Sequence, residues 1–309
     1  MKSATRGPRT PKFELARRTL GKLSLGERLL LWLSRHPEDV EVVSDYEAPG
    51  AAWTVDNALQ PFEAVFPGFR DAIRGKRVLD YGCGDGFQAI ALARAGAADV
   101  VGVEVSQARL RHARALAGET RTEGVEFTEK AEGRFDVVIS LDAVEHFLEP
   151  EENLREMVAA LTPEGRVFVT FGPLWFAPFG HHMHFFAPWP WLNLLFSERT
   201  VYRIRSLYRK DGATTYAPDL NRMTVKKFRS LLKSSGVRVE SLRYGTVKDL
   251  PIVAHIPLLR ELFVNQANAV LGRNLDEVIP HAAPATAKQK DRDRRVRNQP
   301  SQSVSVPSA

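Results

Sequence analysis

Short apolar runs alternate with amphipathic segments along residues 77–245 of this 309-residue chain. The runs are rich in valine and other apolar residues, whereas the segments between them place apolar residues at helical spacing. Nearly continuous apolar strands separated by helices indicate a parallel sheet that is covered by helices on both faces. The predicted strands are 77–82, 99–105, 125–129, 134–142, 166–172 and 237–245, and the predicted helices are 87–96, 106–117, 151–162 and 224–236.

Two further segments lie outside this alternation. Ser24 precedes an apolar run and is a suitable helix N-cap, so we predict that residues 13–74 form an N-terminal helical cap. Residues 173–222 separate the strand at 166–172 from the next predicted helix. Inserted chain at the carboxyl edge of an α/β sheet lies over the place where such folds bind ligands, so we interpret this segment as a lid.

Positive charge is concentrated at the two ends of the chain. The formal net charge is +6, but residues 1–24 carry seven Lys and Arg against one Glu, and residues 281–309 carry six against two Asp. Residues 25–280 are therefore net acidic, whereas a nucleic-acid-binding enzyme more often has a basic face on its folded core. Because the ends, 1–12 and 281–309, hold almost no large apolar residues, we predict disordered basic tails. The acidic remainder of the chain disfavours a nucleic-acid partner.

The cysteine content and the hydropathy of the chain indicate the cellular compartment in which the protein works. Cys83 is the single cysteine, which excludes an internal disulfide and a multi-cysteine zinc site. The basic N-terminus lacks the apolar core of a signal peptide, and no run of about 18 uninterrupted apolar residues predicts a membrane span. We therefore expect a cytoplasmic protein.

The first predicted strand ends in a glycine-rich turn, VLDYGCGDG (78–86). Gly82, Gly84 and Gly86 allow the backbone to turn sharply and to approach a ligand with no Cβ in the way. A turn between a strand and a helix is where open α/β sheets bind nucleotide cofactors. Glu104, at the end of the second strand, is placed to accept both hydroxyls of a ribose.

Asp80 argues against a dinucleotide, because its carboxylate would repel a pyrophosphate and would favour a ligand that carries an ammonium group. The spacing D-x-G-x-G-x-G also differs from G-x-G-x-x-G. With three later segments, VVGVEVS, FDVVISLDAVEHF and PEGRVFVTF, this turn resembles the class I S-adenosylmethionine-dependent methyltransferases. The resemblance covers about residues 75–172 and continues more weakly to 245. It implies a doubly wound, seven-stranded, Rossmann-like sheet in a methyltransferase domain at 75–272, with S-adenosylmethionine as cofactor.

The resemblance also implies roles for individual residues. Residues of the glycine turn are expected to line the methionine moiety, with its ammonium group near Asp80, and Glu104 is expected to hold the ribose hydroxyls. Val105 is expected to flank the adenine. The family often reads the adenine amino group with an Asp-Ala pair that this sequence lacks, and Glu129 is the nearest candidate. The predicted cofactor-binding residues are Asp80, Gly82, Gly84, Gly86, Glu104, Val105 and Leu141.

Three residues with a D-x-x-E-H spacing, Asp142, Glu145 and His146, follow the fourth predicted strand. Two methyltransferase groups are similar here with E-x-x-E-H: the ubiquinone-pathway O-methyltransferases and the enzymes that methylate the 3′ ends of small RNAs. In both groups the segment supplies ligands to a divalent metal. Carboxylates and imidazole suit such an ion, so a metal site completed by a histidine of the insertion is one interpretation. A catalytic base, or a histidine that packs on the cofactor loop, are the others.

The insertion begins with GPLWFAPFGHHMHFF (172–186), which holds His181, His182 and His184 among aromatic residues. An aromatic wall with a few polar groups is typical of a small-molecule pocket. The alternatives are a patch that packs against the N-terminal helix or a partner, and a peripheral contact with a membrane. The candidate membrane residues are Trp175, Trp189, Trp191, Arg199 and Arg203.

These patterns together predict methyl transfer from S-adenosylmethionine to an oxygen of a small-molecule, glycan or lipid-linked acceptor. The predicted catalytic residues are His182 and His146 as bases, with Asp142 orienting them, because a hydroxyl acceptor must lose its proton. A non-catalytic cofactor-binding or scaffold protein of the same fold, or an RNA methyltransferase with a divalent metal, are the alternative functions. The basic residues that could meet a phosphate on the acceptor, or form an exposed helical face, are Arg199, Arg203, Arg205, Arg209 and Lys210.

Overall fold

A computed structural model describes residues 10–40, 53–217 and 219–274 of the chain. These residues belong to one compact unit, Met1–Asp276, and a second unit, Glu277–Ala309, lies outside the described residues. The predicted disordered segments therefore fall outside them as well, except for residues 10–12. No helix in the described part of the chain is long and apolar enough to cross a membrane.

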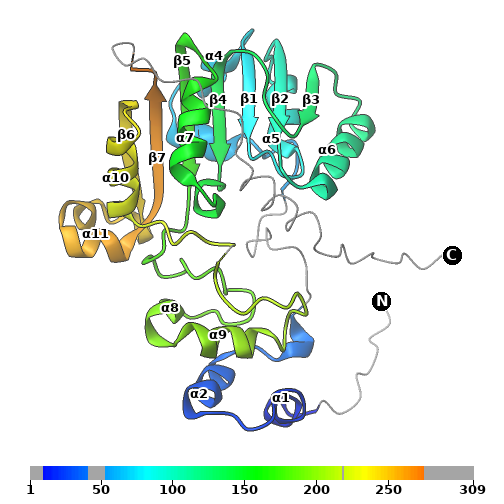
Figure 1. Cartoon of the computed structure of the whole chain (residues 1–309), viewed down its shortest axis with the longest axis vertical. Helices are drawn as coiled ribbons and strands as arrows, with labels where there is room; N and C mark the ends of the chain where they lie inside the picture. The colour runs from blue at the N-terminus through cyan, green and yellow to red at the C-terminus, as the bar shows by residue number, and fades with distance from the viewer. Residues whose placement is uncertain (1–9, 41–52, 218, 275–309) are drawn as a thin grey trace, which may run out of the picture. The chain divides into compact units, whose positions relative to one another are not determined.

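Seven strands form one sheet in the order β3-β2-β1-β4-β5-β7-β6 (Figure 1). The first five strands are parallel, and β7 is antiparallel to both of its neighbours. The carboxyl ends of the parallel strands therefore meet at one edge of the sheet, as the doubly wound prediction requires. The strands are β1 (Arg77–Tyr81), β2 (Asp99–Val103), β3 (Val125–Thr128), β4 (Phe135–Leu141), β5 (Leu161–Phe171), β6 (Arg238–Thr246) and β7 (Val264–Gly272).

Each face of the sheet is covered by helices. On one face, α3 (Gln60–Val65), α4 (Phe69–Ile73), α5 (Phe87–Arg94) and α6 (Gln107–Glu119) pack on the apolar side chains of β1, β2, β4 and β5. On the other face lie α7 (Pro150–Ala159) and α10 (Val225–Ser234), where Phe228 meets Phe171 of β5 edge to face. These two layers confirm the predicted α/β architecture. The remaining short elements are η1 (Pro37–Asp39), η2 (Val144–His146), η3 (Val247–Asp249), η4 (Pro251–His255) and α11 (Pro257–Phe263).

The strand β7 is the element of the sheet that the apolar pattern did not locate. In its sequence, VNQANAVLG, amide side chains interrupt the apolar residues, so it does not have the continuous apolar pattern of a buried strand. Asn268 is nevertheless buried, and its side-chain oxygen accepts a hydrogen bond from the Thr170 hydroxyl of β5 at 2.6 Å. A buried amide is tolerated where a neighbouring strand supplies its partner, and the sequence pattern alone does not reveal that partner.

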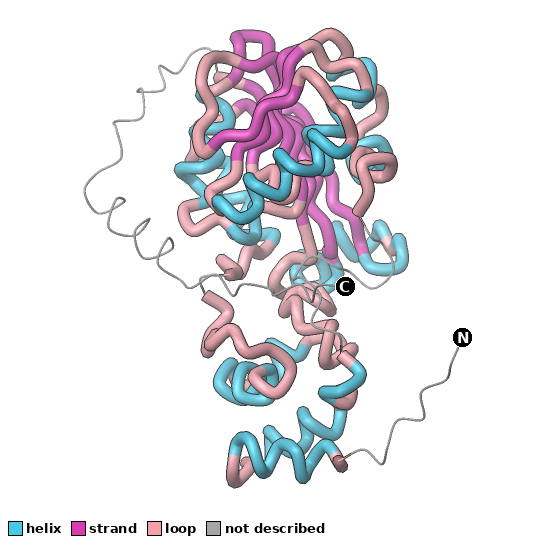
Figure 2. Tube along the Cα trace, turned by 90° about the vertical axis from the view of Figure 1, so that its right-hand side faces the viewer, coloured by secondary structure: helices cyan, strands magenta, loops and turns pink. Residues whose placement is uncertain are grey.

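The chain between β5 and α10 forms a second hydrophobic core with the N-terminal helices. Side chains of α1 (Lys12–Leu20) and α2 (Leu25–Leu33) pack against α8 (Leu192–Leu195), α9 (Glu198–Arg205) and the loops around them. Figure 2 shows these helices and loops as a group apart from the strands. The segment predicted as one N-terminal cap, 13–74, thus contributes to two cores: α1 and α2 pack on the insertion, whereas α3 and α4 pack on the sheet.

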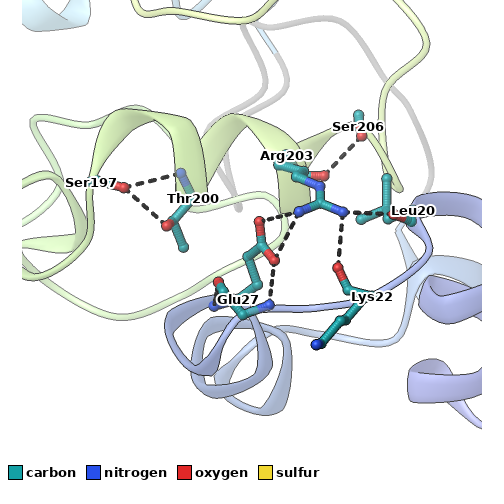
Figure 3. A network of polar contacts seen from close by, with 8 residues as sticks. Leu20, Lys22, Glu27, Ser197, Thr200, Arg203 and Ser206 are labelled. Atoms are coloured by element: carbon teal, nitrogen blue, oxygen red, sulfur yellow. Dashed lines mark hydrogen bonds and ion pairs between the residues drawn. The ribbon is translucent and has the colours of Figure 1, made fainter.

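A buried ion pair joins α2 to α9 (Figure 3). The Ser24 side chain accepts from the Glu27 N–H and the Glu27 carboxylate accepts from the Ser24 N–H, so the predicted N-cap is part of a reciprocal capping box. The Arg203 guanidinium donates to both Glu27 oxygens, at 2.8 and 3.1 Å, and to the carbonyls of Leu20 and Lys22. Burial opposes the charge on Glu27, but the hydrogen bonds from Ser24 and the attraction of Arg203 outweigh it and lower the pKa of this carboxyl.

Replacing Arg203 with Met should lower the free energy of unfolding by roughly 2 kcal/mol, because a buried carboxylate then loses its cation and two carbonyls lose their donor. Thermal unfolding would measure the change, with Arg199→Met on the exposed side of the same helix as the matched control. If both variants unfold at the same temperature as the wild type, the ion pair does not hold α2 and α9 together.

Candidate active site

The turn after β1 brings backbone and carboxylates together at the carboxyl edge of the sheet. The N–H groups of Gly82 and Cys83 both donate to the carbonyl of Val103 at the end of β2, each at 2.9 Å. Gly82 has φ +83° and Gly84 has φ +52°, which are left-handed conformations that glycine adopts at little cost. A Cβ on Gly82 would come within 3.0 Å of the Ala143 Cβ, so the turn also packs closely on the segment after β4.

Asp80 and Glu104 face this turn from β1 and from the end of β2. One side-chain oxygen of Asp80, Oδ2, is buried without a hydrogen-bond partner. Burial and the nearby charge of Glu104 raise the pKa of Asp80 to about 7, against a hydrogen bond from the Ala89 N–H that lowers it. Glu104 accepts hydrogen bonds from the Gly84 N–H at 3.1 Å and from the Ser106 N–H at 2.8 Å. The turn therefore holds two carboxyl groups, and one oxygen of Asp80 lacks a donor or a cation.

The other predicted cofactor residues have different surroundings. Val105 follows Glu104 with its side chain 79% exposed, as a flanking residue for a ring would be, and Leu141 ends β4 against the core of the sheet. Glu129, the candidate for the adenine amino group, is exposed and accepts a hydrogen bond from the Gln107 side chain. Gly86 is explained by packing, because a Cβ there would lie 2.8 Å from Ala113 and 2.9 Å from Phe127.

A second pair of carboxyl groups lies after β4. Asp142 has φ +46°, and its N–H donates to the Thr170 carbonyl at 2.9 Å. The N–H of Gly172 donates to Glu145 Oε1 at 3.3 Å and also lies within hydrogen-bonding reach of the Asp142 carboxyl. Burial raises the pKa of Asp142 to about 7, and burial together with the charge of Asp142 raises the pKa of Glu145 well above its ordinary value. The pair therefore retains a proton at neutral pH.

His146 and His182 meet beside this pair. Their rings lie edge to face with centroids 5.6 Å apart. The Nδ1 atom of His146 lies 2.6 Å from the Asp219 carbonyl, and because a carbonyl can only accept, this nitrogen carries the proton in the neutral ring. His182 forms a hydrogen bond with the Pro173 carbonyl, and its Nε2 is buried with no partner. Both rings are therefore held with the lone pair on Nε2.

The basicity of the two rings differs. Burial lowers the pKa of His146, partly offset by the Asp219 carbonyl. For His182, burial and then the nearby His146 lower the pKa to about 3. His182 is therefore neutral across the physiological range and can accept a hydrogen bond, whereas His146 is the better proton acceptor of the two.

Main-chain carbonyls contact both imidazoles. The carbonyl of Asp219 lies on His146 and that of Pro173 on His182, and the orienting role of Asp142 stays a prediction. Asp142 shares the Gly172 N–H with Glu145. A main-chain carbonyl carries no signature in the sequence, so the spacing of side chains could not have identified these partners.

The other two histidines of the insertion have different settings. His181 is fully buried, accepts from the Met183 N–H at 2.9 Å through Nδ1 and lies 3.1 Å from the Trp189 carbonyl through Nε2. Burial lowers its pKa to about 4, so it is a neutral ring with both nitrogens used in the fold. His184 packs on Phe179 edge to face at 5.0 Å. Neither ring is positioned beside His146 as His182 is.

Two other features bear on the boundaries of the site. Within residues 10–40, 53–217 and 219–274, no group of three or more His, Cys, Asp or Glu side chains is arranged to hold a metal ion. A hollow of about 440 Å³ lies elsewhere, between α10 and β6, and is lined by residues that include Arg229 and Lys233 but by none of the predicted site residues. Arg109 is a cation that the sequence did not single out: its guanidinium would lie 3.2 Å from a Cβ on Gly84, and its charge acts on His146.

Comparison with known proteins assigns the fold to a family. Residues 60–213, which contain the glycine turn and the Asp142–His146 segment, match the sequence model of a methyltransferase domain. The chain belongs to the class I S-adenosylmethionine-dependent methyltransferases. This assignment confirms the resemblance noted in the sequence, the enzyme class and S-adenosylmethionine as the cofactor of the family.

Curated relatives include two ubiquinone biosynthesis O-methyltransferases. The chain is 33% identical to that of Bordetella avium over 132 residues, which is 38% of this chain and 54% of the relative. It is 27% identical to that of Acinetobacter baylyi over 146 residues, which is 42% of this chain and 61% of the relative. The chain thus spans little more than half the length of these relatives. Among solved structures, magnesium protoporphyrin IX methyltransferase from Synechocystis PCC 6803 is similar over 85% of this chain and 94% of its own, at 18% identity and a TM-score of 0.44.

The residues of the methyltransferase turn fit the cofactor. S-adenosylmethionine carries an ammonium group, and the partnerless oxygen of Asp80 is a buried acceptor that such a cation would satisfy. Glu104 is held by two backbone N–H groups and keeps lone pairs for further donors, such as ribose hydroxyls. Gly82 and Gly84 leave the backbone between the two carboxyl groups free of side chains.

S-adenosylhomocysteine should stabilise the protein by about 2.7 kcal/mol at 100 times its dissociation constant, which raises the unfolding midpoint by several degrees. Glu104→Gln should abolish this shift, because the amide keeps the shape of the side chain but loses the charge and one acceptor. Glu126→Gln, exposed on β3, is the matched control and should keep it. A full shift in Glu104→Gln would exclude Glu104 from the cofactor site.

Binding of S-adenosylhomocysteine should weaken by up to tenfold for each pH unit below about 7. Without ligand, Asp80 is protonated below that pH, and it must release its proton to pair with the ligand ammonium. Isothermal titration calorimetry in two buffers of different ionisation enthalpy would detect this released proton. Asp80→Asn should bind more weakly with a flat pH profile, and an unchanged profile in that variant would show that Asp80 does not face the ammonium group.

Proposed function

We propose that this chain transfers the methyl group of S-adenosylmethionine to a hydroxyl of a small-molecule acceptor. The observation that carries the proposal is the pair of imidazoles, His146 and His182, held at the edge of the sheet with the lone pair on Nε2. A hydroxyl acceptor must lose its proton as it attacks the methyl carbon, and neutral imidazole is suited to receive it. The O-methyltransferases among the relatives support an oxygen acceptor.

The proposed cofactor residues are those of the turn after β1 and the ends of β2 and β4. Asp80 takes the ammonium group, Glu104 takes the ribose hydroxyls, and Val105 and Leu141 flank the adenosine. Gly82 and Gly84 provide the backbone surface, whereas the packing role of Gly86 places it behind that surface. Arg109 beside Gly84 is a suitable partner for the carboxylate of the methionine moiety.

The two histidines divide the work on the acceptor. His146, the more basic ring, takes the proton of the attacking hydroxyl at Nε2, while its Nδ1–H stays on the Asp219 carbonyl. His182 stays neutral because its pKa is about 3, and its Nε2 accepts a hydrogen bond that orients the acceptor. The Asp142–Glu145 pair lies beside them with a retained proton and holds the Gly172 N–H at the root of the insertion.

We propose that the insertion, about residues 173–222, acts as a lid together with α1 and α2. Its returning arm is tied to the site, because the Asn221 side-chain amide donates to the carbonyls of Val144 and Phe147, at 2.6 and 3.0 Å. His182 reaches the site from the beginning of the insertion, and Asp219 from its end. A lid that carries both a histidine and the carbonyl that orients the other one excludes water as it completes the catalytic set.

The structure narrows the candidates for an acceptor phosphate. Arg203 forms an ion pair with Glu27, and Lys210 donates to the Ser206 carbonyl. Arg205 pairs with Asp211 through its two terminal guanidinium nitrogens, at 2.7 and 2.5 Å. Arg209 lies over the Phe185 ring at 4.1 Å. Arg203 and Arg205 are thus paired with carboxylates, which disfavours them as partners of an acceptor phosphate, whereas Arg199 and Lys210 are exposed. Among a quinol, a glycan and a lipid-linked compound, the ubiquinone biosynthesis O-methyltransferases among the relatives favour a ubiquinone-type ring as the acceptor.

His146→Asn should lower kcat by about a hundredfold and His182→Asn by about tenfold, with little change in S-adenosylhomocysteine binding. The assay measures tritiated methyl transfer from labelled S-adenosylmethionine to a panel of catechols and hydroquinones. For a true base, the loss in His146→Asn shrinks as the acceptor hydroxyl becomes more acidic. His184→Asn, in the same insertion, is the matched control with near-normal turnover.

Two results would contradict the proposal. Equal losses across phenols of different acidity would show that His146 does not act as a base. A wild-type protein that binds S-adenosylhomocysteine but methylates no hydroxyl in the panel would favour the scaffold function.

A further inference from the structure

One face of α2 exposes a stripe of large apolar side chains. Leu25, Leu29 and Trp32 follow each other at i, i+4 and i+7 and are 83%, 50% and 66% exposed. This spacing places them on one side of the helix, whereas Leu30 and Leu31 on the opposite side are fully buried. Exposed apolar residues scattered singly need no explanation, but a continuous stripe on one helix indicates a surface with a partner.

The helical hairpin that carries this stripe is rich in cations. Residues 10–36 hold six Lys and Arg against two Glu. Glu27 is buried against Arg203, which lies outside the hairpin, and Glu14 offsets Arg18 one turn away, so the hairpin keeps an excess of positive charge. The Lys12 ammonium lies at the end of α2, 2.8 Å from the Trp32 carbonyl. The cations are Lys12, Arg17, Arg18, Lys22, Arg28 and Arg35.

A second tryptophan lies at the same end of the helix. Trp189 is 48% exposed, and its indole N–H donates to the Leu33 carbonyl at 2.9 Å. The other two tryptophans considered for membrane contact pack on aromatic rings of the protein. The ring centroids of Trp175 and Tyr216 are 4.8 Å apart, and those of Trp191 and Phe263 are 5.8 Å apart. The exposed apolar surface at this end of α2 therefore includes one tryptophan of the insertion, Trp189.

We propose that this stripe docks α2 onto the surface of a bilayer that contains anionic lipids. An interfacial helix buries an apolar face at the boundary of headgroups and acyl chains, while Lys and Arg beside it meet anionic headgroups and Trp lies at the interface. The capping box and the Glu27–Arg203 ion pair hold α2 in place, so no helix has to form on binding (Figure 3).

The charges argue against a second copy of the chain as the partner. In a two-fold symmetric dimer the same patch faces itself, so the excess positive charge of one hairpin would meet that of the other. An anionic surface is complementary to this excess of positive charge. The proposal does not rest on methyl transfer, because its residues lie on α2 and the hairpin and its readout is lipid binding.

Flotation of the full-length protein with phospholipid vesicles tests this docking. The protein should float with vesicles of phosphatidylcholine and about 30% phosphatidylglycerol, and less with phosphatidylcholine alone. Replacing Leu25, Leu29 and Trp32 with Ser should lower the partition coefficient at least about tenfold while the unfolding temperature stays near that of the wild type. Ile252→Ser with Leu258→Ser is the matched control, because these side chains are 70% and 73% exposed elsewhere on the chain.

The position of Trp32 gives a second, independent readout. Lipids brominated on their acyl chains should quench the fluorescence of the wild type more than that of Trp32→Phe, since only a tryptophan at the interface comes near the bromines. Two results would overturn the proposal. One is vesicle binding that the triple variant retains in full, which would assign it to the basic ends. The other is a wild-type dimer, without lipid binding, that the triple variant disrupts.

Discussion

The edge of the sheet where the parallel strands end is organised around one constraint: acidic side chains are buried there with too few hydrogen-bond donors. Asp80 and Glu145 each keep one side-chain oxygen buried without a partner, and burial raises the pKa of both groups. Such groups destabilise the folded protein as the pH rises from the ordinary carboxyl pKa to the raised one, because the folded state must then give up protons it holds more tightly than the unfolded chain. Buried carboxyl groups with raised pKa values are typical of sites that bind a ligand or catalyse a reaction.

The two sets of carboxyl groups call for different partners. Asp80 keeps one oxygen without a donor and Glu104 accepts from two backbone N–H groups, so a ligand that brings a cation and further donors would complete this set. Asp142 and Glu145 share one backbone N–H, that of Gly172, and burial raises the pKa of both carboxyl groups. The first set is therefore suited to binding, and the second to fixing the start of the insertion beside the two imidazoles. Gly82 of the glycine turn packs closely against Ala143, which follows Asp142 in the chain. The two sets of carboxyl groups are therefore joined by a direct packing contact.

The fold was predictable where one rule of physical chemistry determined the result. The parallel strands were readable because both of their faces are buried, and the cap of α2 because Ser24 and Glu27 satisfy each other locally. The strand β7 was not, since its buried Asn268 depends on a hydroxyl 98 residues away. At the candidate site, side-chain chemistry pointed to Asp80, Glu104, His146 and His182, but the carbonyls of Asp219 and Pro173, which fix the tautomers, depend on tertiary structure alone.

The helix α2 connects the exposed surface to the site through one continuous set of contacts. Its outer side carries the apolar stripe, and its inner side carries Glu27, which forms an ion pair with Arg203 of α9. The loops that pack on α9 in the same hydrophobic core include Met183, the residue after His182. A displacement of α2 would therefore bear on the segment that carries His182. If α2 docks on a bilayer and the insertion closes over the site, as we propose, an acceptor drawn from that bilayer would meet the docking helix and the insertion as parts of one hydrophobic core. This arrangement suits a lipid-soluble ring that is methylated at a hydroxyl.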